Sequence, residues 1–394
     1  MNFSIAKRVQ QVVPSPTLAI AAKATQMSAA GLDIINLSVG EPDFDTPQLI
    51  KDAAIAAIAS GFTKYTAVGG TDELKLAIIN KFKQDNNLDY QSNQILVSCG
   101  AKQSIYNLCQ ALLNPGDEVL IPAPYWVSYP DLVLLAGGIP VIIPTTMQDK
   151  FKINITKLSA AINDQTKLLI LNSPSNPSGI AYDLDELKDL GRILEEHPQI
   201  MIATDDIYEY IIWGRPFVNI INACPNLYSR TITINGVSKA FAMTGWRIGY
   251  AGGPTEIIKA MTTIQSQSTS NPCSISQKAA TYALNLDKTS VASMVTAFQQ
   301  RHQYIFERLV SMPEIEIIPA DGTFYIFPNV QAIITKLGFA NDLEFAAKLL
   351  QETGVAIVPG SAFGNEGCIR ISFASSIEVL TNGLDRLQRF CQIS

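Results

Sequence analysis

A lysine, Lys239, stands in the sequence GVSKAFAMTGWRIGY (236–250), directly after the apolar run TITIN (231–235). Lysine is among the residues least often fully buried, and a buried lysine must pair its charge or give up its proton. One interpretation is that a surface helix begins here and the amine points to water. The alternative is a buried amine that is unprotonated and reactive. The local sequence leaves both interpretations open.

A second candidate group follows the apolar run QILVS, in the turn CGAKQS (99–104). Backbone N–H groups at the start of a helix form an anion site, and the small residues Gly100 and Ala101 would let a phosphate approach closely. An ordinary tight turn is the alternative. Lys102 lies at the positive end of the expected helix, where a cation is disfavoured unless something anionic is nearby.

Two more apolar runs end in polar residues. Asn176 lies in SPSNPSG (173–179), where the following proline directs it away from helical conformation. It is either part of a polar loop or an amide held at the mouth of a site. Asp205 ends the run IMIAT and should be partly buried, with a cationic or N–H partner. It could equally cap a following helix, on which Tyr208 would share its face.

Arg247, eight residues after Lys239, is a side chain suited to bidentate binding of phosphate or carboxylate. No GxGxxG follows an apolar run and no GxxxxGK[ST] is present, so the fingerprints of dinucleotide and P-loop sites are missing. A phosphate cradle, a fixed amide, a carboxylate, a tyrosine, a lysine and an arginine at successive strand ends together describe a pyridoxal phosphate site.

These residues require a common scaffold, and the region from 94 to 252 predicts one. Its short apolar runs alternate with turn signals and helical stretches such as AKQSIYNLCQALL, a pattern typical of a largely parallel sheet between helices. Ligands of such sheets bind at the carboxyl ends of the strands. The runs are QILVS, DEVLI, IPVII, TKLLILN, IMIAT, RTITIN and RIGYAGG.

The rest of the chain has an α+β pattern. A long amphipathic stretch near 285–312 precedes EIEIIPADGTFYIFPN, a helix near 341–352, and the apolar runs VAIVPG and CIRISFAS. No linker-like sequence separates the two regions, so we expect the boundary to fall inside a helix. We predict a large cofactor-binding domain over 48–290, and a small domain from 1–47 plus 291–394.

The composition is that of a globular protein: 394 residues, 47% hydrophobic and 16% charged. The net charge of −6 argues against a general nucleic-acid binder. No 18-residue apolar run and no signal-peptide pattern occur, which predicts a cytoplasmic protein without membrane association. Six dispersed cysteines predict neither a disulfide framework nor a metal site. Two histidines, His197 and His302, are expected to be solvated or structural, so proton transfer would not use histidine.

At this point nearly the whole chain resembles the fold-type I, class I aminotransferases that depend on pyridoxal phosphate, specifically the bacterial and plastid-type aspartate aminotransferases. The motifs that carry the resemblance are specific in combination. They are SVGEPDFDTP (38–47), TKYTAVGG (63–70), PAPYWVSYP (122–130), NSPSNPSG (172–179), DDIYEY (205–210), SKAFAMTGWRIGY (238–250) and RISFAS (370–375).

The resemblance implies a role for each matching residue. Lys239 forms the covalent imine link to pyridoxal 5′-phosphate, and Asp205 keeps the pyridine nitrogen protonated. Tyr208 and Asn176 bind the phenolic oxygen, and Trp126 stacks on the ring. The phosphate is surrounded by Gly100, Ala101, Lys102, Ser238 and Arg247. Tyr65 reaches the phosphate from a partner subunit, which implies a homodimer with shared active sites. Arg370 binds the α-carboxylate of the substrate, helped by Asn176 and the backbone of Gly40, and Trp126 also belongs to the substrate-binding residues.

The resemblance also implies an activity, the transfer of an amino group from L-aspartate to 2-oxoglutarate with ping-pong kinetics. Mammalian-like relatives bind the distal carboxylate with a partner arginine, but IQSQSTSNPCS (264–274) contains none. In the subgroup that this chain resembles, a lysine matching Lys102 takes that role; the alternative is that Lys102 only balances phosphate charge. Ser15 and Thr17 are polar candidates on an N-terminal segment that would close over the site.

Alternative activities remain open. Prephenate, glutamate, aromatic amino acids or alanine are alternative substrates of the same reaction, and a β-lyase or synthase of the same fold would use the same cofactor residues. A cofactor-sensing transcription regulator is the rival from a different class. It would need a DNA-binding region, for which we find no spare segment.

Overall fold

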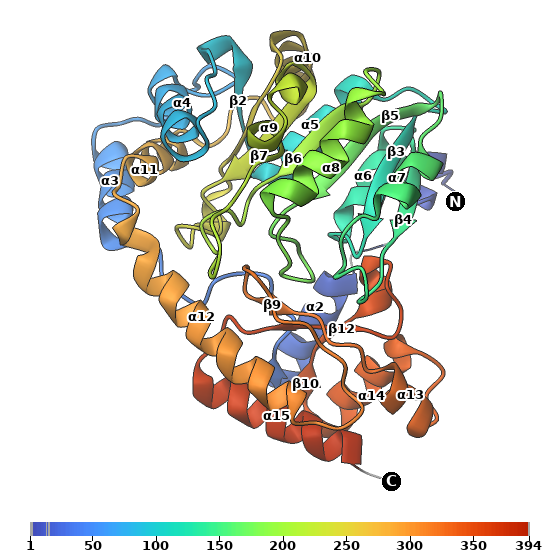
Figure 1. Cartoon of the computed structure of the whole chain (residues 1–394). Helices are drawn as coiled ribbons and strands as arrows, with labels where there is room; N and C mark the ends of the chain where they lie inside the picture. The colour runs from blue at the N-terminus through green and yellow to red at the C-terminus, as the bar shows by residue number, and fades with distance from the viewer. Residues whose placement is uncertain (1–2, 13, 15, 393–394) are drawn as a thin grey trace.

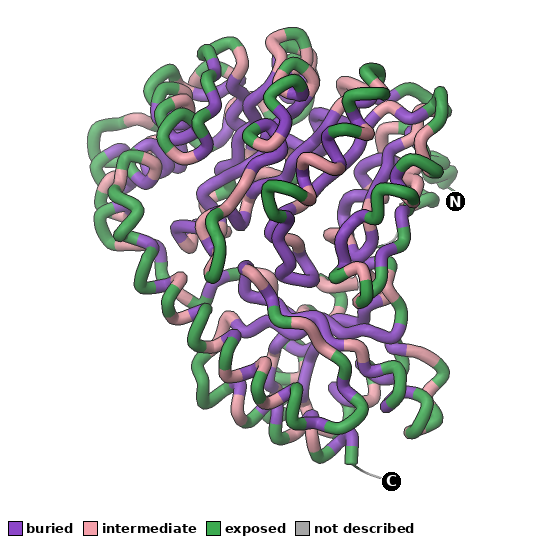
Figure 2. The backbone as a smooth tube through the Cα atoms, in the orientation of Figure 1, coloured by how far each residue is buried: buried purple, intermediate pink, exposed green. Residues whose placement is uncertain are grey.

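The computed structural model of the protein describes residues 3–12, 14 and 16–392, so the candidate Ser15 lies outside the described residues. The chain forms two bodies, one above the other in Figure 1, with the long helix α12 (Thr289–Val310) running from one to the other. Figure 2 shows that each body has its own buried interior. The predicted division at 48–290 stays a prediction.

The larger body is built on a seven-stranded sheet with the order β2-β8-β7-β6-β5-β3-β4. All strands are parallel except β8, which pairs antiparallel with both β2 and β7. Each predicted apolar run forms one strand, which confirms the mostly parallel sheet. The strands are β2 (Ile95–Ser98), β3 (Glu118–Ala123), β4 (Ile139–Pro144), β5 (Thr166–Asn172), β6 (Met201–Asp205), β7 (Thr231–Gly236) and β8 (Gly249–Gly252).

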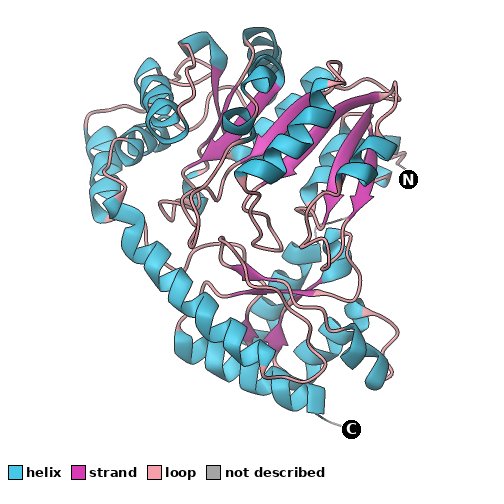
Figure 3. Cartoon of the chain, in the orientation of Figure 1, coloured by secondary structure: helices cyan, strands magenta, loops and turns pink. Residues whose placement is uncertain are grey.

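Helices cover both faces of this sheet (Figure 3) because both faces are apolar. Successive residues of a strand point to opposite faces, so Leu168 and Ile170 of β5 pack in one core cluster, whereas Leu169 and Leu171 pack in the other. The helices are α3 (Gln48–Ala59), α4 (Asp72–Asn86), α5 (Ala101–Leu112), α6 (Ser128–Leu135), α7 (Ile155–Ala161), α8 (Leu184–Glu195), α9 (Ile220–Ala223), α10 (Thr255–Ser268) and α11 (Ser274–Leu284).

Local sequence explains where several of these helices begin. Thr71 accepts a hydrogen bond from the backbone of Leu74 and so caps α4. Asp183 and Glu186 form a capping box at the start of α8, in which each side chain accepts from the backbone of the other residue. Short 3-10 helices complete the body at η1 (Ser92–Gln94), η2 (Pro225–Arg230) and η3 (Thr244–Trp246).

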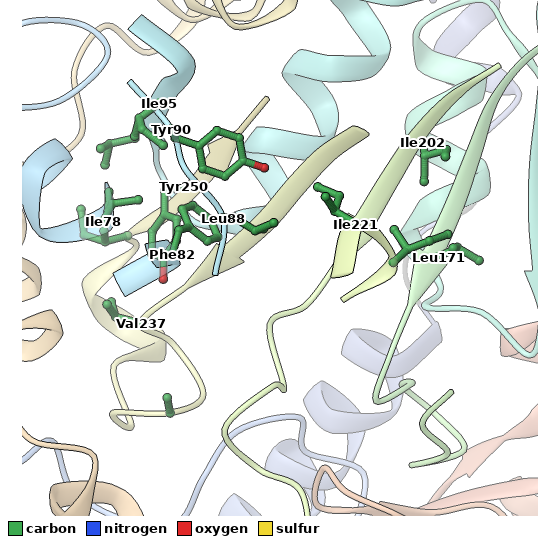
Figure 4. Packing of buried hydrophobic residues seen from close by; sticks show 14 of the residues in the cluster. Ile78, Phe82, Leu88, Tyr90, Ile95, Leu171, Ile202, Ile221, Val237 and Tyr250 are labelled. Atoms are coloured by element: carbon green, nitrogen blue, oxygen red, sulfur yellow. The ribbon is translucent and has the colours of Figure 1, made fainter. Parts of the chain in front are cut away.

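An aromatic cluster fixes α4 against strand β8 of the sheet (Figure 4). The rings of Phe82 and Tyr90 lie 5.1 Å apart, and those of Phe82 and Tyr250 lie 5.6 Å apart, both in edge-to-face geometry. Such pairs stabilise packing beyond the apolar area that they bury. The C-terminal half of α4 is therefore held in a defined position on the sheet.

The smaller body has a parallel pair, β1 with β10, and a three-stranded antiparallel sheet in the order β11-β12-β9. The N-terminal segment thus joins the C-terminal part through strand pairing. The strands are β1 (Ile35–Asn36), β9 (Tyr325–Ile326), β10 (Val355–Ala356), β11 (Val358–Pro359) and β12 (Ile369–Ser372). Its helices are α2 (Pro16–Ala29), α13 (Gln331–Lys336), α14 (Asp342–Thr353) and α15 (Ile377–Gln392), with the 3-10 turn η4 (Gly360–Phe363). The short helix α1 (Lys7–Gln10) instead packs against α6 of the larger body.

Among the described residues, all six cysteines are free, and no helix is long and apolar enough to cross a membrane. Of the two histidines, His302 is buried in α12. Its Nε2 accepts a hydrogen bond from the backbone N–H of Ala320 at 2.9 Å, and its ring lies 5.2 Å from that of Trp213. Burial lowers the pKa of His302 from 6.5 to about 4.

The lowered pKa of His302 predicts that the folded protein loses stability as the pH falls. The folded pKa of His302 lies below the unfolded value, so its contribution is present above pH 6.5 and is lost as the pH falls towards 4. The loss should be at most roughly 3.5 kcal/mol, from about 1.4 kcal/mol for each unit of the pKa shift. His302→Gln keeps an acceptor for Ala320 without titrating. The free energy of unfolding in urea, measured between pH 7 and 4, should therefore depend less on pH for this variant than for the wild type. The same pH dependence in both proteins would contradict a lowered pKa of His302.

Candidate active site

A cavity of about 460 Å³ lies between the carboxyl ends of the sheet strands and the smaller body. Eleven of the thirteen predicted site residues line it, although they come from segments that are far apart in the sequence. They are Gly40, Ala101, Lys102, Trp126, Asn176, Asp205, Tyr208, Ser238, Lys239, Arg247 and Arg370. Gly100 and Tyr65 are not among the lining residues.

Lys239 is half-buried and its amine points into the cavity. The residues around it form turns, so the interpretation as the start of a surface helix is wrong. The Nζ atom donates a hydrogen bond to the carbonyl oxygen of Gly40 at 2.6 Å. Burial, followed by the positive charge of Arg370, lowers the pKa of Lys239 to about 8. A neutral amine is therefore accessible near neutral pH.

Asp205 ends β6, and its buried carboxylate accepts a hydrogen bond from the hydroxyl of Tyr129 at 2.7 Å. Burial raises the pKa of Asp205 to about 6, so the group is mostly ionised at neutral pH. The alternative in which Asp205 caps a following helix is wrong, because 207–210 forms turns instead. The backbone N–H of Ile207 donates to Asp205 at 3.4 Å, as in a short polar turn.

Tyr208 reaches the same cavity from this turn rather than from a helix face. Its hydroxyl lies 3.1 Å from that of Tyr325 in β9, and both rings are buried. Sequence reasoning missed both Tyr129 and Tyr325. The sequence could have indicated Tyr129, because it follows Trp126 by three residues within the motif PAPYWVSYP. In the structure the two rings lie 5.3 Å apart. No sequence feature indicated Tyr325, because only the fold brings β9 to the carboxyl ends of the sheet strands.

Arg370 is buried in β12, and no ion pair among the described residues includes it. Its guanidinium donates to Oδ1 of Asn176 at 3.0 Å and to the carbonyl of Ser38 at 2.7 Å, and it lies 4.4 Å from the ring centre of Tyr325. The Nε atom is buried with no hydrogen-bond partner in the described chain. A buried cation without a counter-charge fits an anionic ligand.

The turn before α5 is shaped for a phosphate. Gly100 has φ +88°, and a Cβ atom there would lie 2.2 Å from Nη2 of Arg247, so only glycine fits. A Cβ atom on Gly249 would lie 2.1 Å from the backbone nitrogen of Ala101. Lys102 is the second residue of α5, as predicted. The N-terminus of α5, Ser238 and Arg247 thus offer donors to a phosphate at one end of the cavity.

These features fit pyridoxal 5′-phosphate. The donors at the start of α5 suit its phosphate, the carboxylate of Asp205 suits its pyridine nitrogen, and the amine of Lys239 suits its aldehyde. Among the described residues, no group of three or more His, Cys, Asp or Glu side chains could hold a metal ion.

Lys102 and Trp126 form one wall of the cavity. The Nζ atom of Lys102 lies 4.9 Å from the ring centre of Trp126, and burial, followed by the charge of Arg247, lowers the pKa of Lys102. Thr17, from α2, also lines the cavity. Tyr65 lies elsewhere, with 92% of its surface exposed in the single chain.

The sequence was compared with known proteins. The model for "Aminotransferase class I and II" matches residues 32–387. An aspartate/prephenate aminotransferase from Nitrosomonas europaea is 54% identical, with 98% of this chain and 99% of that protein covered. An aspartate aminotransferase from a Bacillus species is 49% identical, with 99% and 100% covered.

Solved structures give the same result for the fold. The crystal structure of the aspartate aminotransferase from Rhizobium meliloti superposes with a TM-score of 0.94 at 43% identity and covers 99% of both chains. An aspartate aminotransferase from Thermus thermophilus with maleate has a TM-score of 0.93 at 38% identity, covering 98% of this chain and 100% of that one.

The environment of Lys239 makes a testable prediction about its amine. In the cofactor-free protein, pulse labelling with an amine-reactive reagent, quantified by peptide mass spectrometry, should show half-maximal reactivity of Lys239 near pH 8 instead of 10.5. Arg370→Gln removes a positive charge that disfavours the protonated amine, so the midpoint should move to higher pH. A wild-type midpoint near 10.5 would contradict a buried, partly neutral amine.

Proposed function

This chain belongs to the class I and II aminotransferases, which depend on pyridoxal phosphate, and on that basis we propose that it transfers the amino group of L-aspartate to 2-oxoglutarate. The names of its relatives support this substrate. The observation that carries the proposal is that two cations, Arg370 and Lys102, line the cavity that holds the Lys239 amine, while neither forms an ion pair with another described residue.

The residues of the cavity have distinct roles towards the cofactor. When bound, pyridoxal phosphate supplies an electron sink for the bond that breaks at the substrate Cα. Asp205, ionised above about pH 6, accepts the N–H of the protonated pyridine and is itself oriented by Tyr129. Tyr208 and Asn176 bind the phenolic oxygen, and Trp126 packs on the ring. The phosphate is held by Gly100, Ala101, Lys102, Ser238 and Arg247.

Lys239 has two roles. Its amine would hold the cofactor covalently through the aldehyde, and as a free amine it would move the proton at the substrate Cα. A pKa near 8 suits proton transfer in both directions near neutral pH. The carbonyl of Gly40 orients the amine through its hydrogen bond of 2.6 Å. The reaction therefore needs no histidine, and none lines the cavity among the described residues.

The substrate carboxylates are bound by two cations. Arg370 binds the α-carboxylate with its planar guanidinium, helped by Asn176 and the backbone of Gly40. Lys102 binds the distal carboxylate. The relative from Thermus thermophilus was solved with maleate, a dicarboxylate, which supports a site for two acidic groups. Because several relatives are named aspartate/prephenate aminotransferases, prephenate is a second candidate substrate.

The experiment that tests this function is half-reaction spectroscopy of the purified holoenzyme against a panel of amino acids. Aspartate and glutamate should discharge the absorbance of the lysine-linked cofactor at lower concentrations than alanine or phenylalanine. Lys102→Ala should weaken the apparent affinity for the two acidic substrates about tenfold or more, because a charge-assisted contact is lost. An equal effect on all four amino acids would contradict the role of Lys102 in reading the distal carboxylate.

Lys239→Ala is the control, since without this amine both the absorbance band and turnover should disappear. Activity of the Lys239→Ala variant would show that Lys239 is not the nucleophile. Release of ammonia and pyruvate, in place of a new amino acid, would identify the protein as a β-lyase of the same fold.

We propose further that the protein is a homodimer with shared active sites. Tyr65 is 92% exposed and does not line the cavity of its own chain, which supports a role in the site of a second subunit. Leu49, Ile55 and Ile58 of the adjacent helix α3 are each more than half exposed. Several exposed apolar side chains on one helix are typical of an interface.

Complementation tests the shared site. Tyr65→Ala and Lys239→Ala should each be impaired alone, but a mixed dimer has one intact site. After unfolding and co-refolding, activity should recover to about a quarter of the wild-type value, because half of the dimers are mixed and each has one good site. The control is a mixture of the two variants that have been folded separately, in which subunits have not exchanged and activity should stay low. No recovery, despite mixed dimers detected by mass spectrometry, would overturn the partner role of Tyr65.

A further inference from the structure

A group of buried charged side chains lies outside the cavity, between α4 and the turn segment 206–210. The side chains of Lys81, Asp85 and Glu209 are only 1%, 8% and 4% exposed, and none of them lines the cavity. Removing a charge from water is unfavourable unless it is paired and hydrogen-bonded. Each of these three buried charges therefore needs a partner inside the protein.

The hydrogen bonds join the end of α4 to Glu209 at two points. Lys81 forms an ion pair with Glu209, and its Nζ atom donates to Oδ1 of Asn86 at 2.7 Å. Nδ2 of Asn86 donates in turn to Oε2 of Glu209 at 2.8 Å. Lys81 also lies 3.8 Å from Asp85. Glu209 is thus held by two residues of a helix that the aromatic cluster has already fixed on the sheet (Figure 4).

The group extends from this pair to other elements. Asp85 accepts a hydrogen bond from the hydroxyl of Tyr210 and forms an ion pair with Lys288, which directly precedes α12. At the other end of the segment, Asp206 accepts hydrogen bonds from Thr204 and Asn219. The segment 206–210 is therefore anchored on the side that faces away from the cavity.

This anchoring matters because the segment has no regular structure of its own. It forms turns rather than a helix, so its position depends on contacts with other elements. Asp205 and Tyr208 face the cavity, whereas Glu209 is buried against α4. A buried ion pair is weak as a source of stability, since apolar residues of similar volume often replace it without loss. Directional hydrogen bonds instead define one position of the segment.

We propose that Lys81 and Glu209 are positioning residues, which hold the 206–210 segment so that Asp205 and Tyr208 meet the pyridine ring of the cofactor. This rests on the proposed roles of Asp205 and Tyr208. The phosphate end of the cavity is built from other segments, α5 and the loop around Arg247. Loss of the Lys81–Glu209 pair therefore weakens contacts to the ring and leaves contacts to the phosphate unchanged.

The test measures binding to the cofactor-free protein by calorimetry with two probes. One is 4′-deoxypyridoxine 5′-phosphate, which has the ring and the phosphate but cannot bond to Lys239; the other is inorganic phosphate. Glu209→Gln should weaken binding of the first probe about tenfold, the scale expected when a group that orients a ligand-binding residue is lost, and leave phosphate binding unchanged. Lys83→Met is the matched control on α4, because its ion pair with Asp89 is exposed on both sides.

A double variant of Lys81 and Glu209 distinguishes a positioning role of the pair from a contribution to stability. Lys81→Met leaves Glu209 as a buried unpaired charge and should lower the urea midpoint, whereas Lys81→Met with Glu209→Met should restore it. We expect ring binding to stay weak in the double variant. If ring binding returns together with stability, or if Glu209→Gln weakens both probes equally, the positioning role is wrong. If the wild-type protein fails to bind deoxypyridoxine phosphate, the proposed cofactor site itself fails.

Discussion

The buried guanidinium of Arg370 is the interaction on which the site depends. It has left water without acquiring a carboxylate partner, and its hydrogen bonds go to Asn176 and to the carbonyl of Ser38. Its charge also contributes to the low pKa of Lys239. One desolvated cation therefore has two consequences: its unpaired charge fits an anionic ligand, and it helps to lower the pKa of the neighbouring amine.

This arrangement requires the two bodies of the protein to meet at one edge of the sheet. Arg370 comes from β12 in the smaller body, Asn176 from the loop after β5, and Ser38 and Gly40 from the segment that leads from β1 to α3. That segment is also tied to α12, because Asp43 forms a bidentate ion pair with Arg301 at 2.7 and 2.9 Å. Gly40, whose carbonyl accepts the hydrogen bond from Lys239, therefore lies in a segment that is tied to the smaller body through β1 and to α12 through Asp43.

The strand ends were predictable because a rule of topology applies to them. The apolar runs identify the strands of a parallel sheet, and the residues that follow them gather at the carboxyl edge whatever the details of packing. Asn176, Asp205 and Lys239 were found in this way. The alternative of a helix after Asp205 was wrong because turn hydrogen bonds and the contacts of Glu209 with α4 determine the local conformation. Tyr325 was missed because its contact with Tyr208 joins residues 117 positions apart.

By itself, the sequence determined the family, the cofactor chemistry and the identities of the charged groups, because these depend on residue types at strand ends and in specific motifs. Only the tertiary structure decided the state of those groups. Burial and neighbouring charges, which set the pKa of Lys239 and of Asp205, are sums over contacts between distant segments. The same holds for the Lys81–Glu209 pair, which looks like two ordinary surface charges in the sequence. It becomes a buried contact because α4 packs against the turn that carries Asp205 and Tyr208.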